Sequence, residues 1–137
     1  MTLLVDTGVF LAYADTSDQD HERCPRIARW RYRRPAYHGP CRRQTDWLIE
    51  RQLGARAEAD FYRWVVDGDL SVDDLTTRDT GAIIELTEQY ADNGLGGVDA
   101  SLVAVAERLE LDTIATLDQR HFRVIRPKHV DTFKIVP

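Results

Sequence analysis

The sequence predicts an α/β fold with a mostly parallel central sheet. Short apolar runs that end at turn-forming residues alternate with longer stretches of helical periodicity, and this alternation is typical of βαβ units. The chain of 137 residues suits one compact domain, residues 1–137, with a single core. Its hydrophobic fraction of 43% is ordinary for a globular protein, and we find no internal repeat or flexible linker.

Each element follows from a local pattern. The opening LLVDTG predicts a short buried strand that ends at Asp6, because an apolar run there meets a turn. Residues 98–109 predict a helix, since apolar side chains recur at i, i+3, i+4 and i+7. We expect the other helices at residues 9–14, 45–53, 55–66 and 79–91, with one more beginning within 18–23. We expect the other strands within 67–72, at 113–117 and at the edge of the sheet at 133–136.

Bulk properties narrow the function. No apolar run approaches the roughly 20 residues that a membrane helix needs, and the start lacks the flanks of a signal peptide, so we expect a cytoplasmic protein. Cys24 and Cys41 are too few for a disulfide scaffold and fit no zinc pattern. A net charge of −5 argues against nucleic-acid binding by bulk charge, but a cluster of metal-binding carboxylates would itself make the chain acidic.

Three acids form the candidate catalytic and metal site. Asp6 and Asp118 each follow a predicted strand, and Asp99 lies in the first turn of a predicted helix after a glycine pair. Each has a simpler explanation, as a helix cap or as a carboxylate favoured by the helix dipole. All three nevertheless fall at the carboxyl edge of a parallel sheet, where such folds bind ligands. Carboxylates there would hold Mg²⁺ or Mn²⁺, which can drive phosphodiester hydrolysis.

Neighbouring polar residues are weaker candidates. Thr7 and Thr116 flank the three acids and are expected either to hydrogen-bond to them or to act as ordinary surface or capping hydroxyls. His121 and Phe122 are expected to pack the last helix, on a short turn or helix, rather than to take part in chemistry. The remaining histidines, His21, His38 and His129, show no ligand spacing. Phosphate contacts or, more simply, solvated helix faces account for Arg51, Arg56, Arg63 and Arg120.

At this point the chain resembles the VapC toxins of the PIN-domain ribonuclease superfamily. The segments that carry the resemblance are LLVDTGVFLAYAD, TDWLIERQLG, GGVDASLVAVAERL, TIATLDQRHF and the closing TFKIVP, nearly the whole chain outside residues 24–43. The resemblance implies a three-layer α/β/α fold and a metal-dependent endoribonuclease. It also implies a homodimer, inhibited by a VapB-type antitoxin. The metal ligands of the family carry over onto Asp6, Asp99 and Asp118.

One position departs from the family. A second acid, usually Glu, is expected where this chain has Gln44. An amide oxygen can coordinate a metal, but it carries no charge and cannot act as a base. The alternative function is therefore a catalytically impaired toxin that still dimerises and binds its antitoxin.

Residues 24–43 are anomalous. The stretch is rich in Arg and Pro and has no Asp or Glu, where the family needs a buried apolar strand. We hypothesise that it is translated out of frame. Reading residues 39–44 back into codons, shifting by one base and restoring a single G permits VPAVAE, which continues into TDWLIE. A basic arm that contacts RNA and a disordered insertion are the alternatives. Under frameshift or insertion we expect poor packing and no regular central strand.

Two other functions compete. Asp6, Thr7 and Gly8 match the active-site tripeptide of aspartic proteases, but those proteins are all-β, whereas helical periodicities fill most of this chain. A DNA-directed metal nuclease is a further alternative, because nothing in the sequence reads the 2′-hydroxyl of RNA. The particular RNA target lies beyond what these patterns predict.

Overall fold

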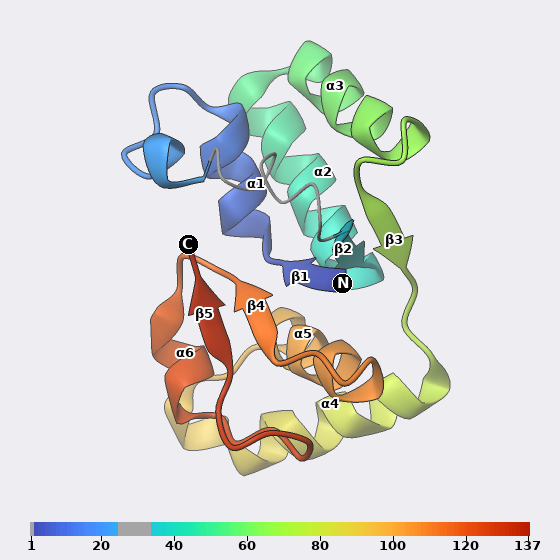
Figure 1. The fold of residues 1–137 in the computed structure, drawn as a ribbon, viewed down its shortest axis with the longest axis vertical. Coiled ribbons are helices and arrows are strands. Elements are labelled where there is room, and N and C mark those ends of the chain that lie inside the picture. Colours follow the sequence, from blue (N-terminus) through green and yellow to red (C-terminus); the bar gives the residue numbers. More distant parts are fainter. Residues whose placement is uncertain (1, 25–33) are drawn as a thin grey trace.

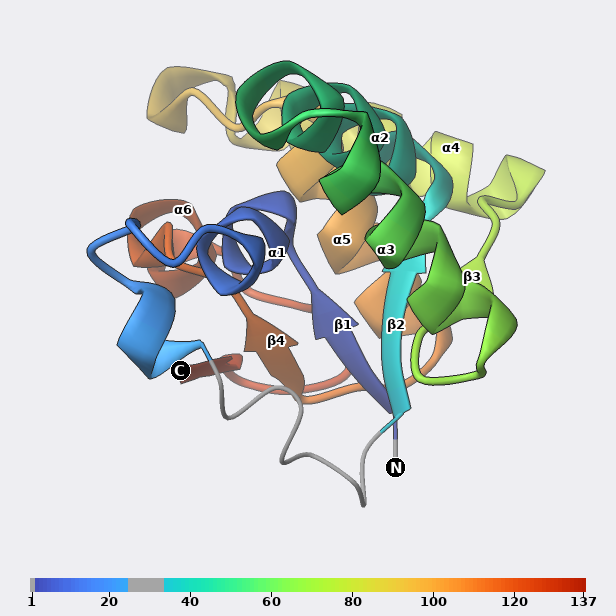
Figure 2. The same cartoon turned by 90° about the horizontal axis from the view of Figure 1, so that it is seen from above.

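A five-stranded parallel sheet forms the centre of the computed structural model, which describes residues 2–24 and 34–137, with side chains for 2–24 and 43–137. The strand order is β3-β2-β1-β4-β5, and each neighbouring pair is parallel. Figure 2 shows β2, β1 and β4 side by side. The strands are β1 (Thr2–Val5), β2 (Arg34–His38), β3 (Ser71–Asp73), β4 (Thr113–Ala115) and β5 (Lys134–Val136).

Helices cover both faces of the sheet, as Figure 1 shows. One group contains α1 (Thr7–Ala14), α2 (Gly39–Leu53) and α3 (Ala55–Val66), which pack in sequence order. The other group contains α4 (Thr77–Gln89) and α5 (Gly97–Arg108), which pack on each other. The short helix α6 (Gln119–Val124) and two 3₁₀ turns, His21–Arg23 and Ala91–Asn93, complete the chain. The predicted α/β class is confirmed.

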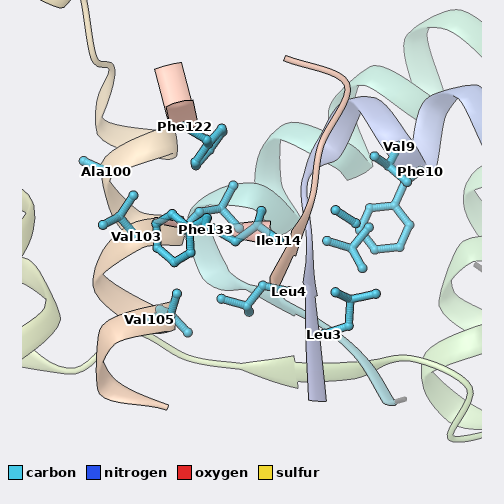
Figure 3. Packing of buried hydrophobic residues seen from close by; sticks show 14 of the residues in the cluster. Leu3, Leu4, Val9, Phe10, Ala100, Val103, Val105, Ile114, Phe122 and Phe133 are labelled. Atoms are coloured by element: carbon cyan, nitrogen blue, oxygen red, sulfur yellow. The ribbon is translucent and has the colours of Figure 1, made fainter. Parts of the chain in front are cut away.

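The core explains this layering. In β1, Leu3 and Leu4 are both fully buried, and Figure 3 shows them on opposite sides of the strand. Leu3 lies on the side of Phe10 from α1, whereas Leu4 lies on the side of Val105 from α5. Successive strand residues point to opposite faces, so burial of both requires helices on each side of the sheet. The continuous apolar run LLV is thus the sequence pattern of a central parallel strand.

Most predicted boundaries agree with the structure. The prediction for α3 matches at both ends, and α4 and α5 differ from theirs by one or two residues at each end. The edge strand β5 is also confirmed. The largest difference is α2, which begins at Gly39, six residues before the predicted start at residue 45.

The expectation of no regular central strand within residues 24–43 is wrong for the backbone. β2 occupies residues 34–38 and pairs with both β1 and β3, with Leu3 opposite Pro35 in the register. The physical reason is that ladder hydrogen bonds join main-chain groups, so two flanking strands can order a segment of unfavourable composition. Cys24, at the start of the stretch, is fully buried as a free thiol. The predicted packing of the other side chains up to residue 42 lies outside the described residues.

A network of charged side chains fixes the β3 edge. The Nε of Arg108, the last residue of α5, donates to both carboxylate oxygens of Asp79 at 3.0 and 2.9 Å. The Nη2 of Arg108 donates to Asp73 Oδ1 at 2.6 Å. Asp79 is only 2% exposed and also forms the capping box of α4 with Thr76. The network therefore joins β3, the start of α4 and the end of α5.

Within residues 2–24 and 34–137, no helix combines the length and the apolar character required to cross a membrane.

Candidate metal centre

The parallel pairing of β1 and β4 brings two of the predicted acids to one edge. Val5 pairs with Ala115, and the Asp6 N–H donates to the Ala115 carbonyl at 2.9 Å. Asp6 therefore lies beside Thr116, two residues before Asp118. Both acids also cap helices: Asp6 accepts from the Thr7 N–H at 2.7 Å, and Asp118 accepts from the Arg120 N–H at 3.2 Å. The two acids therefore cap their helices and also lie at the same edge of the sheet.

Thr116 connects these two acids. Its side chain is buried, and its Oγ1 donates to Asp6 Oδ2 at 2.8 Å while accepting from the Asp118 N–H at 3.1 Å. The Thr116 N–H in turn donates to the Val136 carbonyl at 2.9 Å, which ties the segment to the end of β5. A single hydroxyl therefore orients the Asp6 carboxylate and the backbone of Asp118. The predicted hydrogen-bonding role of Thr116 is confirmed.

Asp99 reaches the same edge from α5. It lies in the first turn of that helix, where the helix dipole favours a carboxylate. Its Oδ2 lies 2.9 Å from His121 Nδ1, and the same nitrogen lies 3.6 Å from Asp118 Oδ2. Both carboxylates thus approach one ring nitrogen. We call Asp6, Asp99, Thr116, Asp118 and His121 the acidic side of the site.

The charges on this side repel one another. Burial raises the pKa of the Asp6 carboxyl above its usual range, and the charges of Asp99 and Asp118 raise it further. The hydrogen bonds from the Thr116 hydroxyl and the Thr7 N–H act in the opposite direction without cancelling this rise. Since the charges of Asp99 and Asp118 act on Asp6, the three acids share one electrostatic neighbourhood.

Three uncharged side chains with described positions lie on another border of the site. Thr45 Oγ1 donates to Thr7 Oγ1 at 3.1 Å, and Thr7 Oγ1 donates to Gln44 Oε1 at 3.2 Å. Thr7 and Thr45 are buried, whereas Gln44 is exposed. We call Thr7, Gln44 and Thr45 the amide side of the site. Because Thr7 directly follows Asp6, the Gln44 amide lies next to the acidic side, at the position where the VapC family has its second acid according to the resemblance.

Sequence reasoning missed two residues. His121 was expected to pack the last helix, but its ring contacts Asp99, whereas its neighbour Phe122 is buried as predicted. The signal was available, since Asp118 and His121 are three residues apart and share a face of a helix. Thr45 was not singled out, and its contact with Thr7 spans 38 residues, which no local pattern reveals.

The other candidates lie outside the cluster. His21 Nδ1 and His129 Nε2 hydrogen-bond to backbone carbonyls of Ala12 and Leu111, and the side chain of His38 lies outside the described residues. Arg63 pairs with Asp60, and Arg56 and Arg120 are exposed. A cleft between α1 and α3, lined in part by Tyr13 and Trp64, lies at the far end of α1 from Asp6. The three acids therefore remain the candidate site.

The donor chemistry of the acidic side fits a divalent cation. Carboxylate oxygens are the ligands that Mg²⁺ and Mn²⁺ prefer, and a bound cation would relieve the repulsion that raises the Asp6 pKa. In the arrangement described, His121 Nδ1 already engages Asp99. Among the residues with described side chains, no three His, Cys, Asp or Glu are placed so that they could hold one metal ion together. The arrangement described therefore does not by itself bring three such side chains around one ion.

Comparison with known proteins finds a full-length relative by sequence. Ribonuclease VapC26 from Mycobacterium tuberculosis (strain ATCC 25618 / H37Rv) is 26% identical over 135 residues, which cover 98% of this chain and 100% of the relative. No protein-family model matches the chain.

Solved structures share the fold at lower identity. VapC20 of Mycobacterium tuberculosis, described as a sarcin-ricin loop cleaving toxin, has a TM-score of 0.74 at 18% identity and covers 82% of this chain and 86% of its own. VapBC2 from Rickettsia felis, bound to a DNA fragment from its promoter, has a TM-score of 0.71 at 13% identity over 100% of both chains. The parallel α/β fold is incompatible with an all-β aspartic protease. The predicted resemblance to the VapC toxins is confirmed, and the chain shares the fold of these solved structures.

Proposed function

We propose that this chain is an endoribonuclease, the toxin component of a toxin–antitoxin system, and that it hydrolyses RNA phosphodiester bonds with Mg²⁺ or Mn²⁺. The observation that carries the proposal is the convergence of three carboxylates, from three distant segments, around the end of β1. The charges of Asp99 and Asp118 act on Asp6, and one ring nitrogen contacts both Asp99 and Asp118. The full-length similarity to ribonuclease VapC26 supports the choice of RNA as substrate.

The residues divide the work by their chemistry. Asp6, Asp99 and Asp118 would hold the cation, which when bound would neutralise phosphate oxygens and favour ionisation of water. Thr116 keeps the Asp6 carboxylate in one orientation through the bond to Oδ2. Asp118 is the most open of the three acids, with 53% of its side chain exposed, so it is the carboxylate that RNA would reach most easily. Gln44 can orient a polar group but cannot take a proton.

The test is RNA cleavage by the purified chain with Mg²⁺ or Mn²⁺ and with excess chelator. Cleavage is expected with the metal and not with the chelator. Asp99→Asn should lower the rate by about 10–100-fold or more, the cost typical of disturbing a metal site. Asp67→Asn is the matched control, since Asp67 is exposed at the end of α3. Metal-independent cleavage, or equal rates for the two variants, would refute the proposal.

A second function is favoured by one observation. The Gln44 amide accepts a hydrogen bond from Thr7 at the position where the resemblance expects an acid. A chain lacking that acid would act as an impaired toxin that still dimerises and binds its antitoxin. Strong cleavage by the unaltered chain would exclude this alternative.

We also propose a VapB-type antitoxin as partner and a homodimer as the assembly. The Rickettsia felis VapBC2 structure and FitAcB from Neisseria gonorrhoeae, with a TM-score of 0.61 at 14% identity over 88% of this chain and 90% of its own, share the fold and support this partner class. Co-expression of the antitoxin encoded beside this chain should yield a stable complex that suppresses cleavage. Molar-mass measurement of the chain alone tests the dimer.

A further inference from the structure

An exposed aromatic side chain lies close to the candidate site. Trp47 on α2 is 52% exposed, although Trp is normally buried to a large extent. The guanidinium of Arg51 lies over its ring, 4.9 Å from the ring centroid. Such a cation–π pair holds a large flat surface and a positive charge in a fixed relation.

Trp47 and Arg51 lie on the same face of α2 as Gln44 of the amide side. Gln44, Trp47 and Arg51 are spaced by three and four residues, so they occupy one face of α2. All three are exposed, while Thr45 and Ile49 on another face are fully buried. At a rise of about 1.5 Å per residue, Trp47 lies roughly 4.5 Å along the helix from Gln44 and Arg51 roughly 10 Å. Gln44 contacts Thr7, the residue after Asp6.

The chemistry of this face suits a single-stranded nucleic acid. Nucleobases stack on exposed aromatic rings and on guanidinium planes, and Arg also neutralises phosphate. The acidic side would repel a phosphate backbone, so a strand that reaches it needs a positive contact near by. Arg51 supplies one in a chain whose net charge is −5.

We propose that Trp47 and Arg51 form a stacking platform for a base of single-stranded RNA next to the cleaved bond. This inference rests on the proposed function, because it names the surface that would hold that substrate. Trp47 stacks on the base, and Arg51 supports the ring and contacts a neighbouring phosphate. Both are positioning residues, since they touch substrate away from the reacting atoms.

The test measures binding without cleavage. A short single-stranded RNA of mixed sequence is titrated against the chain in excess chelator, and intrinsic Trp fluorescence is followed. Quenching is expected in the unaltered chain. It is also expected in the control variant Trp64→Phe, because Trp64 packs against Tyr13 and Phe61 and not beside Trp47 and Arg51. Trp47→Ala should lose the quenching and bind about ten-fold more weakly or worse. Arg51→Ala should lower the slope of log affinity against log salt by about 0.7, the share of one phosphate on a single strand.

A second measurement needs no variant. An RNA of the same length with abasic positions should bind the unaltered chain about ten-fold more weakly, because phosphates remain but stacking is lost. Equal affinity for intact and abasic RNA overturns the proposal. The proposal is also overturned if the Trp47→Ala variant binds RNA normally but forms a smaller assembly in solution than the unaltered chain. The Trp47 face of α2 would then be an interface between copies of the chain. If the unaltered chain cleaves RNA in either case, the proposed function stands and only the platform falls.

Discussion

The two sides of the candidate site are built differently. On the acidic side, Thr116 has bonds of 2.8 and 3.1 Å to Asp6 and Asp118, and His121 lies 2.9 Å from Asp99. On the amide side, Gln44 accepts a bond of 3.2 Å from Thr7, the one hydrogen bond that joins its amide to the described residues. The fold therefore positions the charged groups of the acidic side by several hydrogen bonds, whereas the amide side presents an uncharged, exposed side chain.

The largest expected effect comes from charging the amide side. Gln44→Glu adds a carboxylate beside Asp6, and a correctly placed acid or base typically contributes at least about 100-fold to a rate. We therefore expect metal-dependent RNA cleavage to rise by about 100-fold, measured under single-turnover conditions. Gln52→Glu is the control, because Gln52 is exposed farther along the same helix. An equal gain in cleavage rate in both variants would show that the effect comes from the added net charge and not from the position of the carboxylate.

A smaller loss is expected from the acidic side. Thr116→Val removes the hydroxyl that orients Asp6, so metal affinity and cleavage should fall about ten-fold. Thr116→Ser keeps the hydroxyl and should retain most activity. Thr45→Val, which removes a buried hydroxyl on the amide side, should cost less activity. Calorimetric titration with the metal ion measures the affinity of the three variants. A larger loss of affinity in Thr45→Val than in Thr116→Val would contradict the conclusion that the acidic side holds the metal.

The stability of the metal-free chain should depend on the charge of Asp6. The folded pKa of Asp6 is raised, so the folded state binds the extra proton and stability falls as the pH rises from the unfolded value of about 3.9. Asp6→Asn should therefore stabilise the chain at neutral pH in chelator, and the gain should shrink towards about pH 4. Urea unfolding at several pH values measures this.

Asp15→Asn provides a control of opposite sign. Hydrogen bonds from the Ser17 hydroxyl and N–H lower the pKa of Asp15, so its ionised form adds stability that is lost as the pH falls through the lowered value. Its replacement should weaken the chain at neutral pH. If both variants shifted stability in the same direction, the electrostatic account of the acidic side would be wrong.

The smallest prediction concerns the gene. We propose that residues 24–43 are translated out of frame, which would account for an uncharged amide side. Resequencing should then reveal two compensating one-base differences from related genes, one upstream of the Gln44 codon and one within it. Confirmation of these codons, with no insertion or deletion relative to close relatives, would leave Gln44 as the true residue.

On the acidic side, the positions of the three acids could be predicted from sequence because their signals are local, whereas the contact of His121 with Asp99 was missed. Asp6 and Asp118 each follow an apolar run that predicts a buried strand, and parallel strands end at one edge. The α5 helix, with Asp99 in its first turn, was predicted to within one residue at each end. In these segments, periodicity and turn residues agree with the tertiary structure.

The contacts on the amide side could not be predicted, because they are long-range. β2 is ordered by pairing with β1 and β3, although Pro35 and its neighbours argue locally against a strand. The early start of α2 lies in the same stretch. The Thr45–Thr7 bond joins residues 38 positions apart.

Arg108 has a mechanical consequence for the distant carboxylates. It closes the far end of α5 against Asp73 and Asp79, while Asp99 occupies the opposite end of the same rod. Nine residues of helix span about 13 Å, so the anchor at Arg108 would influence the position of Asp99 at the other end of α5. A substitution that loosens the Arg108 network would then change the placement of the Asp99 carboxylate without altering any residue of the acidic side.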